Sequence, residues 1–187
     1  LCVNPSQWSY IDICGYVLQL EAEGYEVHVC MVDYLLKVPT VGCDKGAAGE
    51  DIRNMYERIR NFMTSRNIAF ITPHQLSTEA KMLIRQGSTD FVKMLPGGGF
   101  YAGCKQIDQV IDLELFIHIE KINGSAYLTV QRGKHRKVEQ TAEEHLYCAL
   151  PFKGKGGIMD DIMGADTTRK RPGGGAIGSG EENPYWE

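Results

Sequence analysis

The strongest constraint on the fold is one apolar run at residues 27–36, VHVCMVDYLL, which contains a single acid, Asp33. The run is rich in β-branched residues and apolar on both faces, so it predicts a buried strand of the parallel type. Strands of that type belong to α/β folds, in which ligands bind at the carboxyl edge of the sheet. Asp33 is expected at that edge, either as a ligand-binding carboxylate or as a turn or cap residue.

The segments around this strand predict a β-α-β unit. Residues 10–23 have the pattern of an amphipathic helix that ends at Gly24. Residues 38–49 contain proline and glycine and predict a flexible loop. Residues 50–66 predict a second helix, because apolar residues recur there every three or four positions, and residues 68–72 predict a second strand. Two strands joined by one helix favour a right-handed crossover and a parallel sheet.

Beyond residue 72 the pattern changes to a long mixed segment followed by antiparallel strands. The expected elements are a loop at 73–104, a short helix near 105–110, strands at 112–119 and 126–132 joined by an Asn123-Gly124 turn, and a last strand at 145–152. The predicted fold class is therefore α/β, with a mostly parallel sheet flanked by helices and an antiparallel hairpin at its C-terminal edge.

The domain is expected to end at residue 152. Residues 153–187 are rich in glycine and lack periodicity, so they predict a disordered tail. The tail ends in an acidic and aromatic segment at 181–187. That segment is either an unstructured end or a peptide that docks on a partner.

Composition narrows the class of protein. The chain has 187 residues, a net charge of −4 and six cysteines without metal-ligand spacing, so reduced thiols and a cytoplasmic location are expected. It has no signal-peptide pattern and no apolar run long enough to span a membrane. The acidic balance excludes nucleic-acid binding by overall charge, so such binding would depend on local basic clusters, at 132–137 and 169–171.

Polar residues follow the second predicted strand, beside the expected position of Asp33. Gln75 is the first candidate and His74 the second for a side chain that senses a terminal phosphate or orients water. A further pair, Lys134 and Arg136, follows a predicted strand; cations two positions apart on an extended segment point the same way and suit one phosphate group. Each of these could instead be an ordinary surface residue, and the basic pair could contact nucleic acid.

Taken in order, these motifs resemble the C-terminal half of the RecA-like core of hexameric replicative helicases of the DnaB type, including those of phages. The motifs that carry the resemblance are Val32-Asp33-Tyr34-Leu35 after a helix ending in Gly24, Gly49-Glu50-Asp51-Ile52, Gln75-Leu76, the segment 103–112, Lys134-His135-Arg136, and the closing strand 145–152. The resemblance covers about three-quarters of the chain.

The resemblance implies an ATP-driven DNA helicase motor that moves along single-stranded DNA during replication, and a replication protein as the partner that the tail at 181–187 would bind. Asp33 would hold Mg²⁺ through water, Gln75 would report on the nucleotide, and Lys134 and Arg136 would reach ATP in the adjacent subunit of a ring, expected to be a hexamer. Loops at 38–49 and 78–104 would line the pore. Phosphate contacts would come from Lys45, Lys81, Arg85 and Lys93, and base stacking from Phe100 and Tyr101.

The sequence departs from the family at one important motif, because it has no phosphate loop of the form GxxxxGK[ST]. The glycine-rich segment 97–105 is a decoy: Lys105 does not directly follow a glycine, Gln106 stands where Ser or Thr is needed, and the segment comes after Asp33. This stretch alone is therefore expected not to hydrolyse ATP. The alternatives are a recombination or repair ATPase of the same fold, and a non-catalytic assembly module derived from one.

Overall fold

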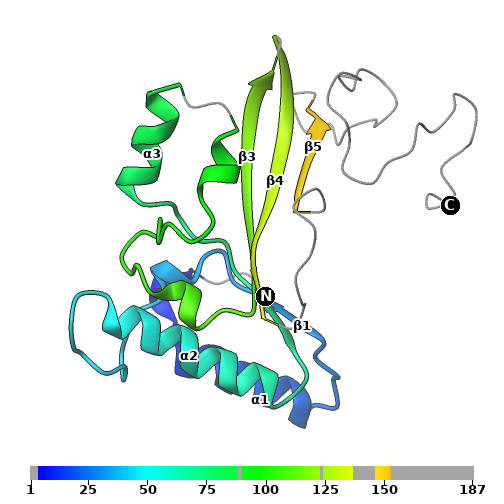
Figure 1. Ribbon diagram of the computed structural model, residues 1–187. Coiled ribbons are helices and arrows are strands. Elements are labelled where there is room, and N and C mark those ends of the chain that lie inside the picture. Colours follow the sequence, from blue (N-terminus) through cyan, green and yellow to red (C-terminus); the bar gives the residue numbers. More distant parts are fainter. Residues whose placement is uncertain (1–3, 88–89, 123, 137–145, 153–187) are drawn as a thin grey trace, which may run out of the picture. The chain divides into compact units, whose positions relative to one another are not determined.

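The computed structural model describes residues 4–87, 90–122, 124–136 and 146–152, which belong to two compact units (Figure 1). The first unit consists of Leu1–Thr89 and Gly97–Glu114, and the second of Asp90–Pro96 and Leu115–Glu187. The predicted tail at 153–187 lies outside the described residues.

The first unit begins with the 3-10 helix η1 (Pro5–Gln7) and the helix α1 (Tyr10–Ala22), of which the sequence predicts the second. Ser9 and Asp12 form a capping box at the start of α1, which satisfies two backbone amides. At the other end Gly24 adopts a left-handed conformation with φ of 91°. The amides of Gly24 and Tyr25 donate back to carbonyls of α1, which is the Schellman arrangement that glycine favours.

The predicted β-α-β unit is present as β1 (Val29–Met31), α2 (Glu50–Thr64) and β2 (Ala69–Ile71), with β1 and β2 paired in parallel. The expectation of a long strand buried on both faces is wrong. β1 has three residues, and the chain turns after it into the 3-10 helix η2 (Leu35–Lys37). Cys30 and Phe70 pack toward the core, whereas the other face exposes apolar side chains, those of Val29, Met31 and Ile71.

The core of the first unit lies between α1, α2 and this sheet. Figure 1 shows α1 and α2 running side by side. Met55, Ile59 and Met63 of α2 are almost completely buried, as the helical spacing predicts. Gly49, which precedes α2, has φ of 85°, and a Cβ there would lie 2.5 Å from the carbonyl oxygen of Gly103. A glycine is required at that position for both reasons.

The segment predicted as a loop at 73–104 contains more structure than expected. It includes the helix α3 (Thr78–Arg85), which begins with Ser77 as N-cap, and the 3-10 helix η3 (Phe91–Met94). The short helix expected near 105–110 is the 3-10 helix η4 (Ile107–Gln109). Among the described residues, no helix is both long and apolar enough to cross a lipid bilayer.

The second unit is built on a sheet of three strands in the order β3 (Leu113–Ile122), β4 (Ser125–His135) and β5 (Tyr147–Pro151). β4 and β5 are antiparallel, with Thr129 opposite Ala149. The three strands were predicted, but β3 and β4 are longer than expected. They form a separate sheet rather than an edge of the β1–β2 sheet, so that part of the prediction is wrong. Of the predicted turn, Gly124 is left-handed with φ of 80°, and residue 123 lies outside the described residues.

Candidate functional site

The Asp33 carboxylate lies just beyond the carboxyl end of β1, at the edge where the sequence predicts a ligand site. Its side chain is exposed in the turn that leads to η2. Within the described part of the chain, no hydrogen bond or ion pair occupies this carboxylate. A cap residue would bond a nearby backbone amide, so the described structure does not support a capping role, whereas Asp33 does lie in a turn, the other alternative that the sequence left open.

Two hydrogen bonds join the residues directly after Asp33 to the segment at the end of β2. The amide of Leu35 donates to the Thr72 hydroxyl oxygen at 2.9 Å, and the side-chain amide of Gln75 donates to the Tyr34 hydroxyl at 2.9 Å. The structure therefore brings Gln75 to the residue that follows Asp33, as two neighbouring parallel strands require. The roles of Thr72 and Tyr34 were not anticipated, although both are polar residues directly at predicted strand ends.

His74, the second candidate beside Asp33, faces the interior of the unit. Its Nδ1 lies 2.7 Å from the Tyr56 hydroxyl and its Nε2 lies 2.9 Å from the carbonyl oxygen of Ala102. A carbonyl only accepts, so Nε2 carries a proton, and in the neutral ring Nδ1 accepts from the Tyr56 hydroxyl. Burial lowers the pKa of His74, although its hydrogen bond to Ala102 opposes that shift. The ring is neutral and both nitrogens are engaged, which leaves Gln75 as the exposed side chain of the pair.

The arrangement at Asp33 can serve a divalent cation in one specific way. An exposed carboxylate at a strand end binds Mg²⁺ as a single ligand, directly or through water, while a nucleotide and further waters supply the other oxygens. No cluster of three or more His, Cys, Asp or Glu side chains with metal-binding geometry occurs among the described residues. The side chain present at Asp33 fits a magnesium ion that arrives with a nucleotide.

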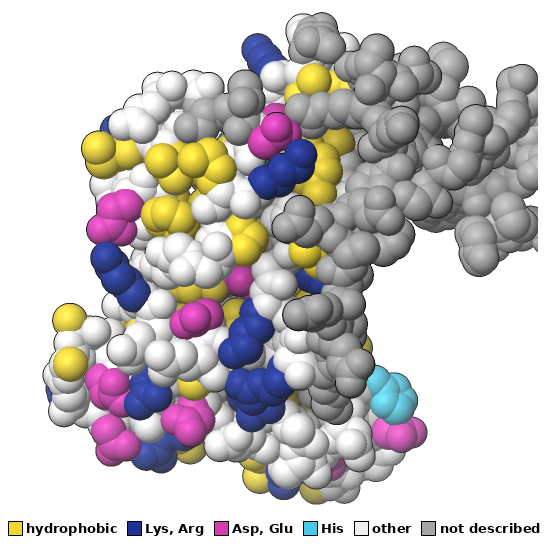
Figure 2. Space-filling view, viewed as in Figure 1, with side chains coloured by type: hydrophobic (Ala, Val, Ile, Leu, Met, Phe, Trp, Pro, Cys, Tyr) yellow, Lys and Arg dark blue, Asp and Glu magenta, His cyan; other side chains and the backbone are white. Residues whose placement is uncertain are grey.

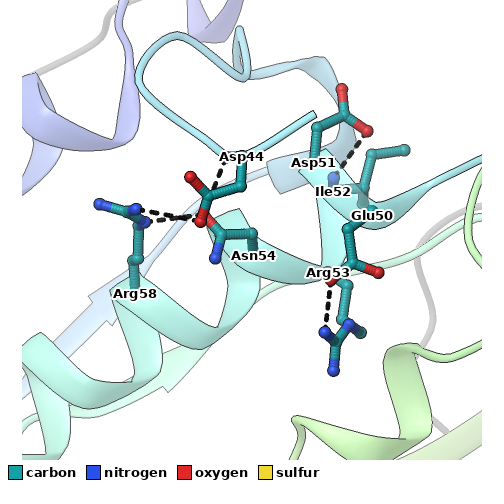
Figure 3. Close-up of polar contacts among 7 residues, drawn as sticks. All are labelled: Asp44, Glu50, Asp51, Ile52, Arg53, Asn54 and Arg58. Atoms are coloured by element: carbon teal, nitrogen blue, oxygen red, sulfur yellow. Dashed lines mark hydrogen bonds and ion pairs between the residues drawn. The ribbon is translucent and has the colours of Figure 1, made fainter. Parts of the chain in front are cut away.

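The loop at 38–49 is held against α2 rather than extended from it. Figure 3 shows Asp44 beside Asn54 and Arg58, which project from successive turns of α2. The Asp44 amide donates to the Asn54 side-chain oxygen at 3.3 Å, and the Arg58 guanidinium lies 3.5 Å from the Asp44 carboxylate. Thr40 also donates to Asp51 at 2.9 Å. Lys45 is exposed next to this anchored residue, so its charge is presented from a defined position.

Two further candidate phosphate-binding residues, Lys81 and Arg85, lie on α3. Both are exposed, and their spacing of four residues puts them on one face of the helix. Figure 2 shows hydrophobic side chains gathered over the region of α3, whose exposed apolar residues are Met82 and Ile84. The helix therefore presents both charge and apolar surface. The sequence prediction placed these residues on a loop and missed the helix.

The glycine-rich segment 97–105 is not a phosphate loop in this structure. A phosphate loop leads into an α-helix whose N-terminal amides face the anion, but this segment leads only to the 3-10 helix η4. The Lys105 ammonium lies 3.4 Å from the Glu79 carboxylate. Tyr101 is buried and its hydroxyl donates to Glu114, so the expectation that it stacks on nucleic-acid bases is wrong.

The second unit carries the predicted basic pair at the end of β4. Lys134 lies within the strand, and Arg136 follows in a turn directly after it. Lys93, on η3, lies 3.2 Å from the Asp90 carboxylate and stacks over the Tyr147 ring at 4.2 Å. These contacts hold Lys93 on the surface of its own unit.

A comparison with protein families identifies the chain. The family model of divergent DnaB-like ATPases matches residues 1–181. The chain belongs to the divergent DnaB-like ATPase family. This agrees with the resemblance to DnaB-type helicases that the motifs around Asp33 and Gln75 indicate. No curated protein sequence matches this family member significantly.

Two solved structures show which part of the fold this DnaB-like chain represents. A DnaB-like replicative helicase, solved for its interactions with primase, has 16% sequence identity and a TM-score of 0.60 over 79% of the chain. A second structure, an isolated ATPase domain, has 17% identity and a TM-score of 0.52 over 77%. The chain spans 34% of the first protein and 48% of the second. At these identities the likeness establishes the fold, that of part of a DnaB-like ATPase domain.

Proposed function

We propose that this chain is part of the motor of an ATP-driven DNA helicase. In this proposal Asp33 binds the magnesium ion of MgATP, and Gln75 senses the terminal phosphate or orients the attacking water. Lys134 and Arg136 act on ATP bound by the adjacent subunit of a ring, where a cation stabilises the charge of the transition state. The ring is a hexamer, and hydrolysis moves it along single-stranded DNA.

The observation that carries this proposal is the joined pair of strand ends. Gln75 donates to the hydroxyl of Tyr34, and Leu35 donates to Thr72, so Asp33 and Gln75, the residues proposed as metal ligand and sensor, lie at one edge of the sheet. Phosphoryl transfer depends on positioning and electrostatics more than on covalent chemistry by the protein. An exposed carboxylate and an adjacent amide supply both requirements.

DNA binding is proposed at exposed cations of the first unit. Lys81 and Arg85 project from one face of α3, and Lys45 projects from the loop anchored on α2. These residues would follow the phosphates of a single strand, and Lys93 is proposed as a further phosphate contact on the second unit. Because the net charge is −4, binding would depend on these positions and would weaken steeply with salt.

The test is ATP hydrolysis by the complete ATPase, in which a phosphate loop outside these 187 residues completes the site. Asp33→Asn is expected to abolish Mg²⁺-dependent hydrolysis, because the amide keeps the shape of the side chain but not its charge. Glu26→Gln is the matched control, since Glu26 is an exposed acid that precedes β1. Retained activity in Asp33→Asn would rule out the metal-binding role.

A second candidate function is a non-catalytic assembly module. It is favoured by the apolar face of the β1–β2 sheet, where Val29, Met31 and Ile71 are exposed, because exposed apolar surface marks interaction sites. The two functions differ in one measurement on the complete protein. A motor hydrolyses ATP in a way that depends on Asp33, whereas an assembly module retains its partners unchanged in Asp33→Asn.

A further inference from the structure

The short segment around Gln75 is held by backbone pairing on one side only. The Ser77 amide donates to the carbonyl of Phe100 at 2.8 Å, and the Ala102 amide donates to the carbonyl of Gln75 at 2.9 Å. Leu76 and Tyr101 form an antiparallel bridge between the same two segments. These bonds fix the position of the Gln75 backbone relative to residues 100–102.

The side chain of His74 adds a second restraint to this backbone pairing. Its ring bonds the Ala102 carbonyl through Nε2 and the Tyr56 hydroxyl through Nδ1, so it links the segment to α2. The ring also meets the edges of two aromatic neighbours, with centroids 5.8 Å from Tyr56 and 6.0 Å from Tyr101. Tyr56 itself is 6% exposed, so the anchor lies inside the core.

Neighbouring residues in an extended segment point to opposite sides. His74 points inward and is half-buried, whereas Gln75 points outward and is exposed, with its amide on the Tyr34 hydroxyl. A rotation that withdraws the imidazole from its two partners therefore turns the Gln75 amide away from Tyr34. The direction of the Gln75 side chain therefore depends on the position of the His74 ring.

We propose that His74 is a positioning residue: its imidazole, held between Tyr56 and Ala102, fixes the direction in which Gln75 presents its side-chain amide. This arrangement, the His74 clamp, consists of His74 held between Tyr56 and Ala102 and lies entirely within the first unit. Its effect on catalysis rests on the proposed function, in which Gln75 acts at the terminal phosphate of ATP.

The hydrogen bonds also set which tautomer of the neutral ring can serve. Nε2 must carry the proton that is donated to the Ala102 carbonyl, so in the neutral ring Nδ1 accepts from the Tyr56 hydroxyl. Burial lowers the pKa of His74, which favours that neutral ring, with the Ala102 hydrogen bond acting in the opposite direction. A glutamine can also donate once and accept once, so it is the natural conservative replacement.

The first experiment observes Gln75 directly, in the 187-residue chain and without activity. In NMR spectra the side-chain amide of Gln75 should show shifts typical of a fixed hydrogen bond, and His74→Phe should move them to those of a free amide. Tyr56→Phe, which removes one hydroxyl, should give a smaller change in the same direction. His28→Phe is the matched control, because His28 is an exposed histidine before β1. Methyl signals of Met55 and Ile59 report whether the core is intact.

The second experiment asks whether His74 acts through Gln75 in the complete ATPase. His74→Phe should lower kcat by up to about 100-fold, the order of loss that a small misplacement of a reacting group produces, with KM for ATP little changed. His74→Gln should recover part of that loss. In a Gln75→Ala background, His74→Phe should cause no further fall in kcat, because the group it positions is already gone.

The outcomes separate the clamp from the function assigned to Gln75. Unchanged Gln75 amide signals in both His74→Phe and Tyr56→Phe overturn the proposal whatever the activity. Full additivity of His74→Phe and Gln75→Ala also overturns it, since a residue that only stabilises the fold would act independently. If the amide moves as expected but Gln75→Ala hydrolyses ATP normally, the clamp stands and the catalytic role of Gln75 fails.

Discussion

Both sheets of this molecule expose apolar side chains on one face, but they differ in the residues that they bury on the other. In the first unit, α1 and α2 cover the inner face of the β1–β2 sheet, and the buried cluster is almost entirely apolar. In the second unit the inward positions of β3 and β4 carry aromatic and polar side chains, including Phe116, Thr129 and Gln131. The outward positions of β3 are apolar, and Leu115, Ile117 and Ile119 are each about half exposed, at 51%, 59% and 47%.

This difference shows which part of the fold holds each candidate residue in place. Asp33 and Gln75 stand on a unit with its own core, so their geometry is a property of that unit alone. Lys134 stands on a strand whose neighbour presents apolar residues to solvent among the described parts of the chain. Large apolar surfaces of that kind are normally covered by another element or molecule. The proposed roles of Lys134 and Arg136 at the site of an adjacent subunit depend on assembly, whereas the hydrogen bonds around Asp33 and Gln75 lie within one unit.

The largest effect is expected when Asp33 and Arg136, one from each unit, are inactivated in different subunits. Asp33→Asn and Arg136→Ala should each inactivate the complete ATPase, the latter by about 10³-fold or more, as for loss of an arginine finger. Mixing the two inactive proteins should restore hydrolysis if Arg136 acts on the neighbouring subunit. In a random equal mixture about a quarter of the sites (one half times one half) would combine an intact Asp33 with an intact Arg136.

The control is each variant alone, taken through the same mixing procedure, which should remain inactive. Failure of the mixture to recover any activity, with rings shown to exchange subunits, would mean that both residues serve the site of their own subunit. Arg136 would then act without a neighbouring subunit, and the contrast between the two units would not apply to catalysis.

A second prediction compares the two units in stability. Met55→Ala removes a side chain that is 0% exposed, and should lower the free energy of unfolding by about 3 kcal/mol because it leaves a cavity. Ile117→Ala removes an apolar side chain of β3 that is 59% exposed, and should change it by less than about 0.5 kcal/mol. Chemical denaturation of the chain measures both. A large loss in Ile117→Ala would show that the outer face of β3 is covered.

The helices α1 and α2 and the order of the strands could be predicted from the sequence pattern, because α2 buries the residues that its spacing marks and Gly24 ends α1. The length of β1 could not. Its apolar composition is the same whether a strand continues or turns, and the turn after Met31 is fixed by a bond from Leu35 to Thr72, distant in sequence.

For the candidate site, sequence order placed Gln75 at the same edge as Asp33, because parallel neighbours end together. The sequence did not show which of His74 and Gln75 faces inward, because that depends on the contacts of His74 with Tyr56 and Ala102. It also missed α3, whose eight residues include Ala80 as the one that is buried, so its apolar pattern is too short to stand out.

A third prediction concerns the start of the first unit. Ser9→Ala should destabilise the chain by about 1 kcal/mol, because it removes the N-cap of α1. The hydrogen bonds from Ser9 lower the pKa of Asp12 from its ordinary value of 3.8. The ionised carboxylate therefore stabilises the fold at pH values above 3.8, and this stabilisation is lost as the pH falls through the lowered pKa. Unfolding measured from about pH 7 to about pH 2 should therefore show a weaker acid dependence in Ser9→Ala. An unchanged dependence would exclude the capping box as its source.

The smallest effect tests where the first unit ends. Arg60 of α2 donates twice to Asp112, at 2.7 and 2.8 Å, and this pair ties the chain to α2 directly before β3 begins. Both side chains are partly exposed, so a double-mutant cycle with Arg60→Ala and Asp112→Ala should give a coupling of roughly 0.5 kcal/mol, reduced by salt. A coupling of that size means that the last residues of the first unit are held mainly by buried contacts, such as Glu114 on Tyr101. A coupling several times larger would make the Arg60–Asp112 pair the main anchor of residues 112–114.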